Sequence, residues 1–213
     1  MARPAPSELD EETIPVPRLV RFPVELRLPE GFDPDDAATW PHVDGRLEWV
    51  GGRLLYMPPC ADEQQDTVAD VVTPLGLWTR NHPDFVVGTN EAGLRLGGDR
   101  RAADAAVFRR AEVGPYTKRF RTVPPVLAVE VAGGDDESET ALREKARWYL
   151  DNGVAIVWLV LLDRREVIVL TRSAEHRYGM QDTVPVSPLL PGLAPAVAEL
   201  FRQRAAADPA EPS

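Results

Sequence analysis

The sequence predicts a mixed α/β fold, in which a β-sheet is flanked by helices. Two observations support this class: β-rich runs recur along the chain, and segments with helical spacing of apolar residues separate them. The chain has 213 residues, of which 44% are hydrophobic, enough for one ordinary core and too little for two. We therefore expect one main domain over residues 39–203, with an N-terminal extension over 1–38 and a frayed tail over 204–213.

The first elements follow from local composition. Residues 1–38 contain seven prolines and the acidic groups SELDEE and DPDD without any sustained period, so we expect a loosely ordered, Pro-rich extension. RLEWV and RLLYM then flank Gly51 and Gly52, which supply the positive φ angles of a two-residue turn, and predict an N-terminal β-hairpin over 46–57. Apolar spacing predicts a helix over 61–80, which Pro74 should kink or break.

The remaining elements alternate between strand and helix. Strand patterns occur in FVVGT, GLRLG, RAADAAVF (101–108) and VLAVEVA (126–132). A helix is expected from about 137 to 151, with Asp136 as its N-cap and Glu139 three residues later. AIVWLVLL and EVIVL then form a second hairpin around 163–165, and LLPGLAPAVAELF ends in a short closing helix.

Two carboxylates interrupt otherwise apolar strand patterns. Asp104 lies among alanines in RAADAAVF, and Glu130 lies between valines in VLAVEVA. A carboxylate removed from water costs several kcal/mol unless it is paired, protonated or bound to a metal, and small neighbours leave room for a ligand. The two acids therefore suggest one shared site. The alternative for each is a residue at a strand edge that reaches solvent.

A lysine completes the pattern. At about 100° per residue, Lys145 falls on the apolar stripe of helix 137–151 with Leu142, Ala146 and Tyr149, so it points inward. The alternative is a snorkelling lysine whose ammonium finds water. Two acids and an inward lysine suit phosphodiester hydrolysis, because carboxylates hold Mg²⁺, or Mn²⁺ in its place, and an ammonium stabilises negative charge on phosphorus. We predict that Asp104, Glu130 and Lys145 are catalytic.

These residues make the chain resemble the PD-(D/E)XK nuclease superfamily and, within it, the Uma-type restriction-endonuclease family, formerly a domain of unknown function. The likeness covers about residues 44–201, and its most specific part is VLAVEV followed by EKARWYLDNGVAIVWLV. Asp104 matches the motif Asp of the family, and Glu48 matches the acidic residue of its opening hairpin. The resemblance implies a restriction-endonuclease-like mixed β-sheet and a metal-dependent endonuclease acting on nucleic acid, DNA first of all. It also implies Glu48 as a further metal ligand beside Asp104 and Glu130.

The chain departs from the family pattern at several positions. Ala103 replaces the Pro before the motif Asp, and GGDDES replaces a Ser-Pro loop after Glu130. Ala132 stands where the wider superfamily has its lysine, so Lys145 on the helix has to serve. Gln64, Gln65 and Asp66 occupy the place of a family His at the start of the first long helix. The alternative hypothesis is a catalytically silent relative that acts as a binding or regulatory module, which the acidic net charge and the altered loop favour.

Charge constrains the partners. A formal net charge of -10 repels a polyanion on average, so binding of nucleic acid has to rest on a local cluster of positive charge. Between Arg95 and Arg121, eight basic residues stand against three acidic ones, and we expect Arg100, Arg101 and Arg109 to contact phosphates. The alternative is a solvated loop.

Other classes of protein and site are disfavoured by the sequence. The single Cys60 excludes internal disulfides, and the three histidines lack metal-binding spacing, so no zinc site is expected. No apolar stretch reaches the roughly 20 residues of a membrane span, and the N-terminus has no export leader, so we expect a cytoplasmic protein without membrane contact. The choice between DNA and RNA stays open, as does the oligomeric state, with a homodimer among the options.

Overall fold

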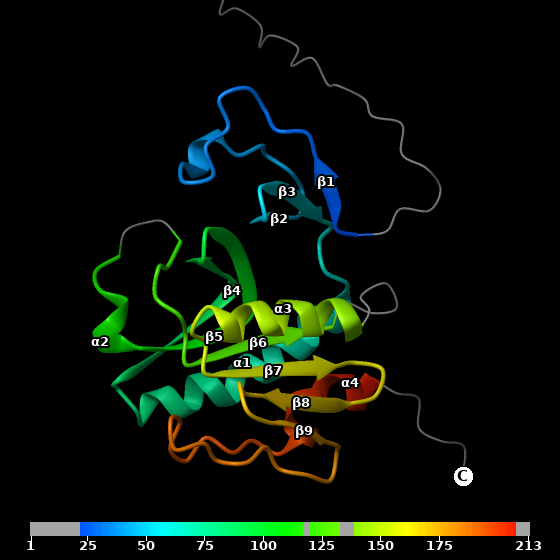
Figure 1. Ribbon diagram of the computed structural model, residues 1–213. Helices are drawn as coiled ribbons and strands as arrows, with labels where there is room; N and C mark the ends of the chain where they lie inside the picture. The colour runs from blue at the N-terminus through cyan, green and yellow to red at the C-terminus, as the bar shows by residue number, and fades with distance from the viewer. Residues whose placement is uncertain (1–21, 117–119, 133–138, 208–213) are drawn as a thin grey trace, which may run out of the picture.

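The structure is a computed structural model, which describes residues 22–116, 120–132 and 139–207. Within these ranges a nine-stranded mixed sheet forms the centre, in the order β1-β3-β2-β5-β6-β7-β8-β9, with β4 paired to β5 off this path. Helix α3 covers one face of the sheet, and α1 lies on the other (Figure 1). The strands are β1 (Val24–Leu26), β2 (Arg46–Val50), β3 (Arg53–Met57), β4 (Phe85–Leu96), β5 (Asp99–Arg109), β6 (Leu127–Val131), β7 (Ile156–Leu161), β8 (Glu166–Leu170) and β9 (Glu175–Tyr178).

The helices join and cover these strands. The β6–α3–β7 segment is the parallel crossover of the sheet, and the other strand pairs of the described residues are antiparallel. None of the described helices is both long and apolar enough to cross a membrane. The helices are the α-helices α1 (Asp62–Arg80), α2 (Arg110–Val113), α3 (Glu139–Asp151) and α4 (Arg202–Ala207), and the 3₁₀ helices η1 (Ala37–Thr39) and η3 (Val197–Phe201).

The N-terminal hairpin is confirmed. β2 and β3 pair in antiparallel register around Gly51 and Gly52, whose φ angles are 57° and 79°. The expectation of a loosely ordered extension is wrong for residues 22–38, because β1 extends the sheet beside β3 and Asp35 binds the side chains of Arg95 and Arg100. Residues 1–21 of that predicted extension lie outside the described residues.

Three further expectations need correction. Of the kink or break expected at Pro74, the break does not occur: helix α1 is continuous through Pro74, because Val71, Leu75 and Trp78 of its buried stripe hold both halves against the sheet. The two strand pieces FVVGT and GLRLG form one strand, β4, with a shift of register between Thr89 and Ala92. Residues 204–207 of the expected frayed tail belong to α4, whereas 208–213 lie outside the described residues, as does the expected N-cap Asp136.

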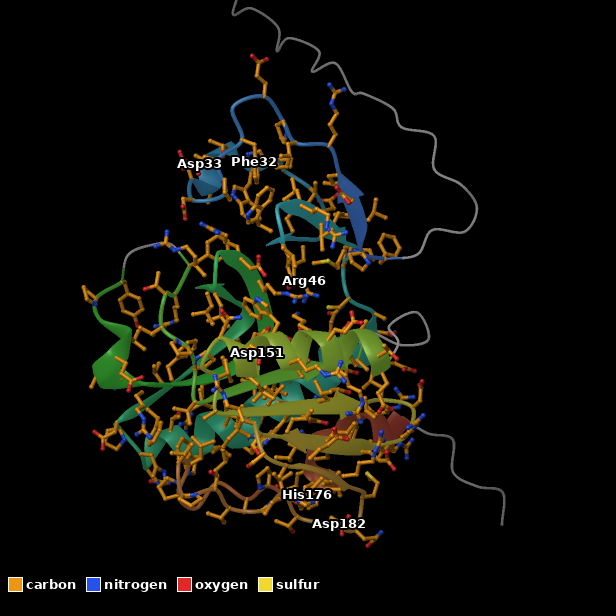
Figure 2. All side chains as sticks on the ribbon, viewed as in Figure 1. Phe32, Asp33, Arg46, Asp151, His176 and Asp182 are labelled. Atoms are coloured by element: carbon orange, nitrogen blue, oxygen red, sulfur yellow. The ribbon has the colours of Figure 1, made fainter. Side chains whose placement is uncertain are left out.

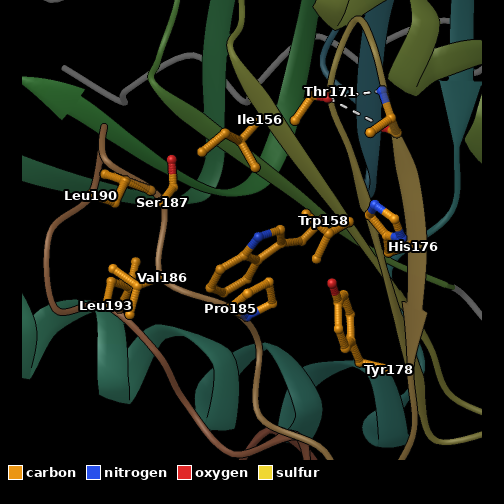
Figure 3. Close-up of a pocket in the computed structure, with 12 residues that line it drawn as sticks. Ile156, Trp158, Thr171, His176, Tyr178, Pro185, Val186, Ser187, Leu190 and Leu193 are labelled. Carbon is orange, nitrogen blue, oxygen red and sulfur yellow. Dashed lines mark hydrogen bonds between the residues drawn. The ribbon is translucent and has the colours of Figure 1, made fainter.

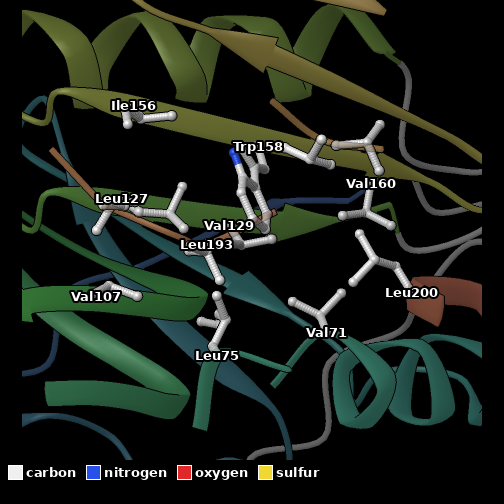
Figure 4. Close-up of a cluster of buried hydrophobic side chains, with 14 of the residues drawn as sticks. Val71, Leu75, Val107, Leu127, Val129, Ile156, Trp158, Val160, Leu193 and Leu200 are labelled. Carbon is white, nitrogen blue, oxygen red and sulfur yellow. The ribbon is translucent and has the colours of Figure 1, made fainter. Parts of the chain in front are cut away.

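The buried side chains of the sheet divide between its two faces. On the α1 face, Val71 and Leu75 pack against alternate residues of β5, β6 and β7, including Trp158 (Figure 4). On the α3 face, Leu142, Ala146 and Tyr149 pack against the small alanines of β5 and β6. Because β6 is buried along its whole length, any ionisable side chain on it lies in the interior.

Candidate active site

The site forms where one edge of β5 changes its partner. β2 pairs with this strand at Arg100, and β6 pairs with it from Ala105 to Val107. We call residues 101–104 of β5, between these two pairings, the fork. The other edge of β5 is paired with β4, so the unpaired backbone groups of the fork point toward β2 and β6.

Site side chains bind the backbone groups of the fork, and of the facing end of β6, that have no strand partner. The N–H of Ala102 donates to Glu48 Oε1 at 3.1 Å, and its carbonyl accepts from Lys145 Nζ at 2.8 Å. The N–H of Val131 donates to Asp104 Oδ2 at 2.7 Å, and its carbonyl accepts from Gln64 Nε2 at 2.9 Å. The strands therefore separate without leaving these four buried groups unsatisfied.

Lys145 bridges two acids from different strands. Its Nζ lies 2.8 Å from Glu130 Oε2 on β6 and 3.2 Å from Glu48 Oε1 on β2. The exposed fraction of Lys145 is 5%. The residue therefore lies on the buried stripe of α3, as the helical spacing predicts, and it does not snorkel to water. Since the ammonium also donates to the Ala102 carbonyl, three groups fix its position.

Asp104 reaches the same cluster from β5. With Glu130, it lies on the α3 face, as Ala106, Phe108 and Ala128 of the same alternating positions do. Its Oδ1 lies 3.6 Å from Nη1 of Arg46, a residue of β2 that the sequence did not single out. Arg46 and Glu48 are two positions apart on β2, so period-2 alternation could have placed both on this face.

Burial and ion pairing set the protonation of the cluster. Burial works to raise the pKa of Glu48, but Lys145, Arg101 and Arg46 together lower it to about 2. Burial works to lower the pKa of Lys145, yet the charges of Glu130 and Glu48 hold it above its ordinary value. The ammonium and the Glu48 carboxylate are therefore both charged at neutral pH.

Glu130 has a second partner on the same helix. Tyr149 Oη donates to its Oε1 at 2.6 Å, one turn along α3 from Lys145. Burial raises the pKa of Glu130, the positive charge of Lys145 lowers it, and the negative charge of Asp104 raises it again. The net pKa of Glu130 is raised. Burial also raises the pKa of Tyr149 well above its ordinary value, so the phenol keeps its proton and donates. No role for Tyr149 is predicted from the sequence, because an inward tyrosine on an apolar stripe resembles a core residue.

The predicted set of three metal ligands is not assembled. Among the described residues, no three His, Cys, Asp or Glu side chains lie together in a group that could hold a metal ion. Glu48 instead gives both of its oxygens to Arg101, Ala102 and Lys145. Asp104 and Glu130 still suit a hard cation, because Mg²⁺ takes as few as one or two carboxylates with waters, and each carboxylate oxygen has two lone pairs.

The predicted phosphate-binding arginines lie apart. Arg101 lies in the cluster, 3.1 Å from Glu48 Oε2, with its guanidinium over the Trp148 ring. Arg100 is buried and binds Asp35 and the Gly98 carbonyl. Arg109 ends β5 far along the strand, beside Glu112 and the ring of Phe85. Only Arg101 of the three contacts a member of the acidic cluster.

The comparison with protein families decides the relationship. Residues 34–199 match the Uma2 family, whose description is "Putative restriction endonuclease". The chain belongs to the Uma2 family. Among proteins with curated functions, none matches. A match among solved structures is the crystal structure of a putative nuclease belonging to DUF820 from Anabaena variabilis ATCC 29413, with a TM-score of 0.68 and 16% identity over 78% of this chain and 94% of that chain.

The expected restriction-endonuclease-like fold is thus confirmed for this Uma2 protein. Where the sequence lacks the His expected near the start of the first long helix, Gln64 has an 8% exposed fraction and binds the Val131 carbonyl. An amide at this position therefore supports the end of β6, next to Glu130, without contributing a titratable group.

A pocket lies across the sheet from the cluster. It is lined by β7, β8, β9 and the segment 185–193, with Trp158 and Tyr178 on its wall (Figure 3). Trp158 belongs to the core on the α1 face, whereas Glu130 binds Lys145, a buried residue of α3. No predicted site residue lines this pocket, and the fork is the candidate active site of the described chain.

Proposed function

We propose that this Uma2 protein is a metal-dependent endonuclease that hydrolyses phosphodiester bonds of DNA. The observation that carries the proposal is the convergence of Asp104 from β5, Glu130 from β6 and Lys145 from α3 at one fork in the sheet. Separate strand-edge acids and a solvent-seeking lysine would not converge in this way. The family description supports the same reaction class.

Asp104 and Glu130 are proposed to hold a divalent cation, Mg²⁺ or Mn²⁺, together with water ligands. The chemistry that such a cation supplies when bound is polarisation of a phosphoryl oxygen and a lowered pKa for a bound water. Glu48 is proposed as a positioning residue, because it binds Lys145 and the backbone of Ala102 in place of a metal.

Lys145 is proposed to stabilise the negative charge that develops on the phosphoryl group. Its ammonium is held by Glu130, Glu48 and the Ala102 carbonyl, so its position is fixed before substrate arrives. A preorganised charge in a buried site costs no reorganisation during the reaction. Because the two acids raise its pKa, Lys145 acts as a fixed positive charge and not as a base near neutral pH.

The test is cleavage by the purified full chain. Supercoiled plasmid, single-stranded DNA and RNA of matched length are each incubated with Mg²⁺, with Mn²⁺ or with chelator. We expect metal-dependent cleavage of DNA that is abolished by chelator and by Asp104→Asn or Glu130→Gln. Asp151→Asn is the matched control, since Asp151 is an exposed carboxylate on α3, and it should cleave as the wild type does.

A protein that cuts none of these substrates with either metal would contradict the proposal. So would cleavage that survives in Asp104→Asn, because it would come from another site or a contaminant. A catalytically inactive binding or regulatory module is the second candidate. It is favoured by the ion pairs of the cluster, in which Arg46, Arg101 and Lys145 already supply partners for the acids. Metal-independent binding of nucleic acid without cleavage would support it.

A further inference from the structure

The cluster at the fork is balanced in charge. Its ion pairs join three acidic side chains, each from a different strand, to three basic ones, two on strands and one on α3. The acids are Glu48, Asp104 and Glu130, and the bases, in the described part of the chain, are Arg46, Arg101 and Lys145. A divalent cation that entered this cluster would add two positive charges to a group that is already neutral, which opposes its binding.

Arg46 is the base that faces Asp104. Its Nη1 lies 3.6 Å from Asp104 Oδ1, and its Nε lies 3.9 Å from Glu48 Oε1. The side chain starts at the first residue of β2 and reaches across the space between the β2–β3 hairpin and α3 (Figure 2). The side chain of Arg46 is 16% exposed and therefore reaches solvent more than the side chain of Lys145, which is 6% exposed.

The two oxygens of Asp104 have different neighbours. Oδ2 accepts the N–H of Val131 at 2.7 Å, and this bond fixes the carboxylate to the end of β6. Oδ1 is the oxygen that Arg46 faces. A cation bound through Oδ1 would therefore lie beside the guanidinium, and two positive charges within a few ångströms repel strongly in a partly buried site.

We propose that Arg46 is a placeholder cation, which neutralises Asp104 in the metal-free protein and competes with a divalent cation for Asp104 Oδ1. The inference rests on the proposed function, since it concerns the same metal site. It assigns Arg46 a positioning role toward the metal and not a role in bond cleavage. Metal binding then displaces the guanidinium from Asp104, and the protein gives up part of its metal affinity for a stable metal-free cluster.

Calorimetric titration of the full chain with Mn²⁺ tests the competition directly. Arg46→Met keeps an unbranched apolar stem but removes the guanidinium and its charge, and we expect it to bind Mn²⁺ roughly tenfold tighter or more. Arg46→Lys keeps the charge and should bind close to wild type. Arg53→Met is the control, because Arg53 lies on the same hairpin, is 58% exposed and contacts only Glu25 among the described acids. It removes the same net charge and should leave the affinity unchanged.

Thermal unfolding is a second measurement that tests the same proposal. In chelator, Arg46→Met should melt below wild type, because Asp104 loses the Arg46 guanidinium, and Mn²⁺ should raise its melting temperature more than that of wild type. Where Arg46→Met does not fold, Arg46→Gln replaces it as a neutral side chain that can still donate hydrogen bonds.

A folded neutral variant, Arg46→Met or its replacement Arg46→Gln, that binds Mn²⁺ no more tightly than wild type would overturn the proposal while leaving the metal site standing. If wild type binds no Mn²⁺, or if Asp104→Asn binds it as wild type does, the proposed metal site itself falls and the competition falls with it. The two failures are thus distinguishable in one set of titrations.

Discussion

The ammonium of Lys145 lies 2.8 Å from Glu130 Oε2, although the two residues come from different layers of the protein, α3 and β6. The contact links the helix to the sheet at the point where β5 parts from β6. Lys145 therefore has two roles. Its positive charge suits it to bind a phosphoryl group, and the same charge offsets the cost of burying the Glu130 carboxylate.

Lys145→Met should therefore damage both stability and activity. We expect a loss of about 3–5 kcal/mol of unfolding free energy, because buried carboxylates lose their cation, and a fall in cleavage of at least about 100-fold. Urea denaturation in chelator and initial cleavage rates measure the two effects. Arg147→Met, at an exposed position of the same helix, is the matched control. Full activity in Lys145→Met would remove the lysine from the proposed chemistry.

Tyr149→Phe should remove one hydrogen bond to Glu130 without creating a cavity in the core. The change removes a hydrogen bond of 2.6 Å to Glu130 Oε1 and leaves the ring in place. We expect a loss of about 1.5–3 kcal/mol and a fall in metal affinity or activity of roughly 10- to 100-fold. Tyr116→Phe, at a side chain that is 92% exposed, should change neither quantity. An unaltered metal affinity in Tyr149→Phe would show that the phenol serves only the fold.

Binding of nucleic acid should depend on Arg101 more than on Arg109. Arg101 lies in the cluster at the fork, whereas Arg109 lies at the other end of β5. With cleavage blocked by Asp104→Asn, Arg101→Ala should weaken binding to a short duplex and reduce the salt slope by up to about one unit. The slope of Arg109→Ala should stay at the value of the Asp104→Asn background. The reverse order would move the nucleic-acid surface away from the fork.

Acid should remove the stability that Glu48 contributes. Its pKa is lowered from 4.5 to about 2 in the folded protein, so its contribution is present above pH 4.5 and is lost as the pH falls toward 2. We expect the free energy of unfolding of wild type to exceed that of Glu48→Gln by about 3 kcal/mol near neutral pH. The difference should shrink as the pH falls from 4.5 toward 2. Denaturation in chelator at a series of pH values measures it. A difference that does not change between pH 5 and pH 2 would contradict the assignment.

Much of the fold follows from local sequence. Gly51 and Gly52 determine the hairpin turn, and the stripe of Leu142, Ala146 and Tyr149 determines the buried face of α3. Pro74 and the short strand β1 show the limit of such reasoning. The packing of Val71 and Leu75 on the sheet outweighs the cost of a proline, and β1 is ordered by β3, which lies far from it in sequence.

The site also combines residues that local sequence predicts with contacts that depend on the tertiary structure. Asp104, Glu130 and Lys145 stand out because each is a charge within an apolar pattern. The contact of Arg46 with Asp104 does not stand out, because it depends on how the hairpin meets β5 across the fork. The use of Glu48 as a partner of Lys145 and Ala102 likewise depends on backbone groups that only the three-dimensional structure exposes.

Asp104 and Glu130 are proposed to share one divalent cation. Crystals of the full chain soaked in Mn²⁺ and measured at the manganese absorption edge locate the ion directly. We expect one anomalous peak at the fork, with oxygens of both carboxylates among the ligands of the ion. Peaks confined to other surfaces, or an ion that touches only one of the two carboxylates, would contradict it.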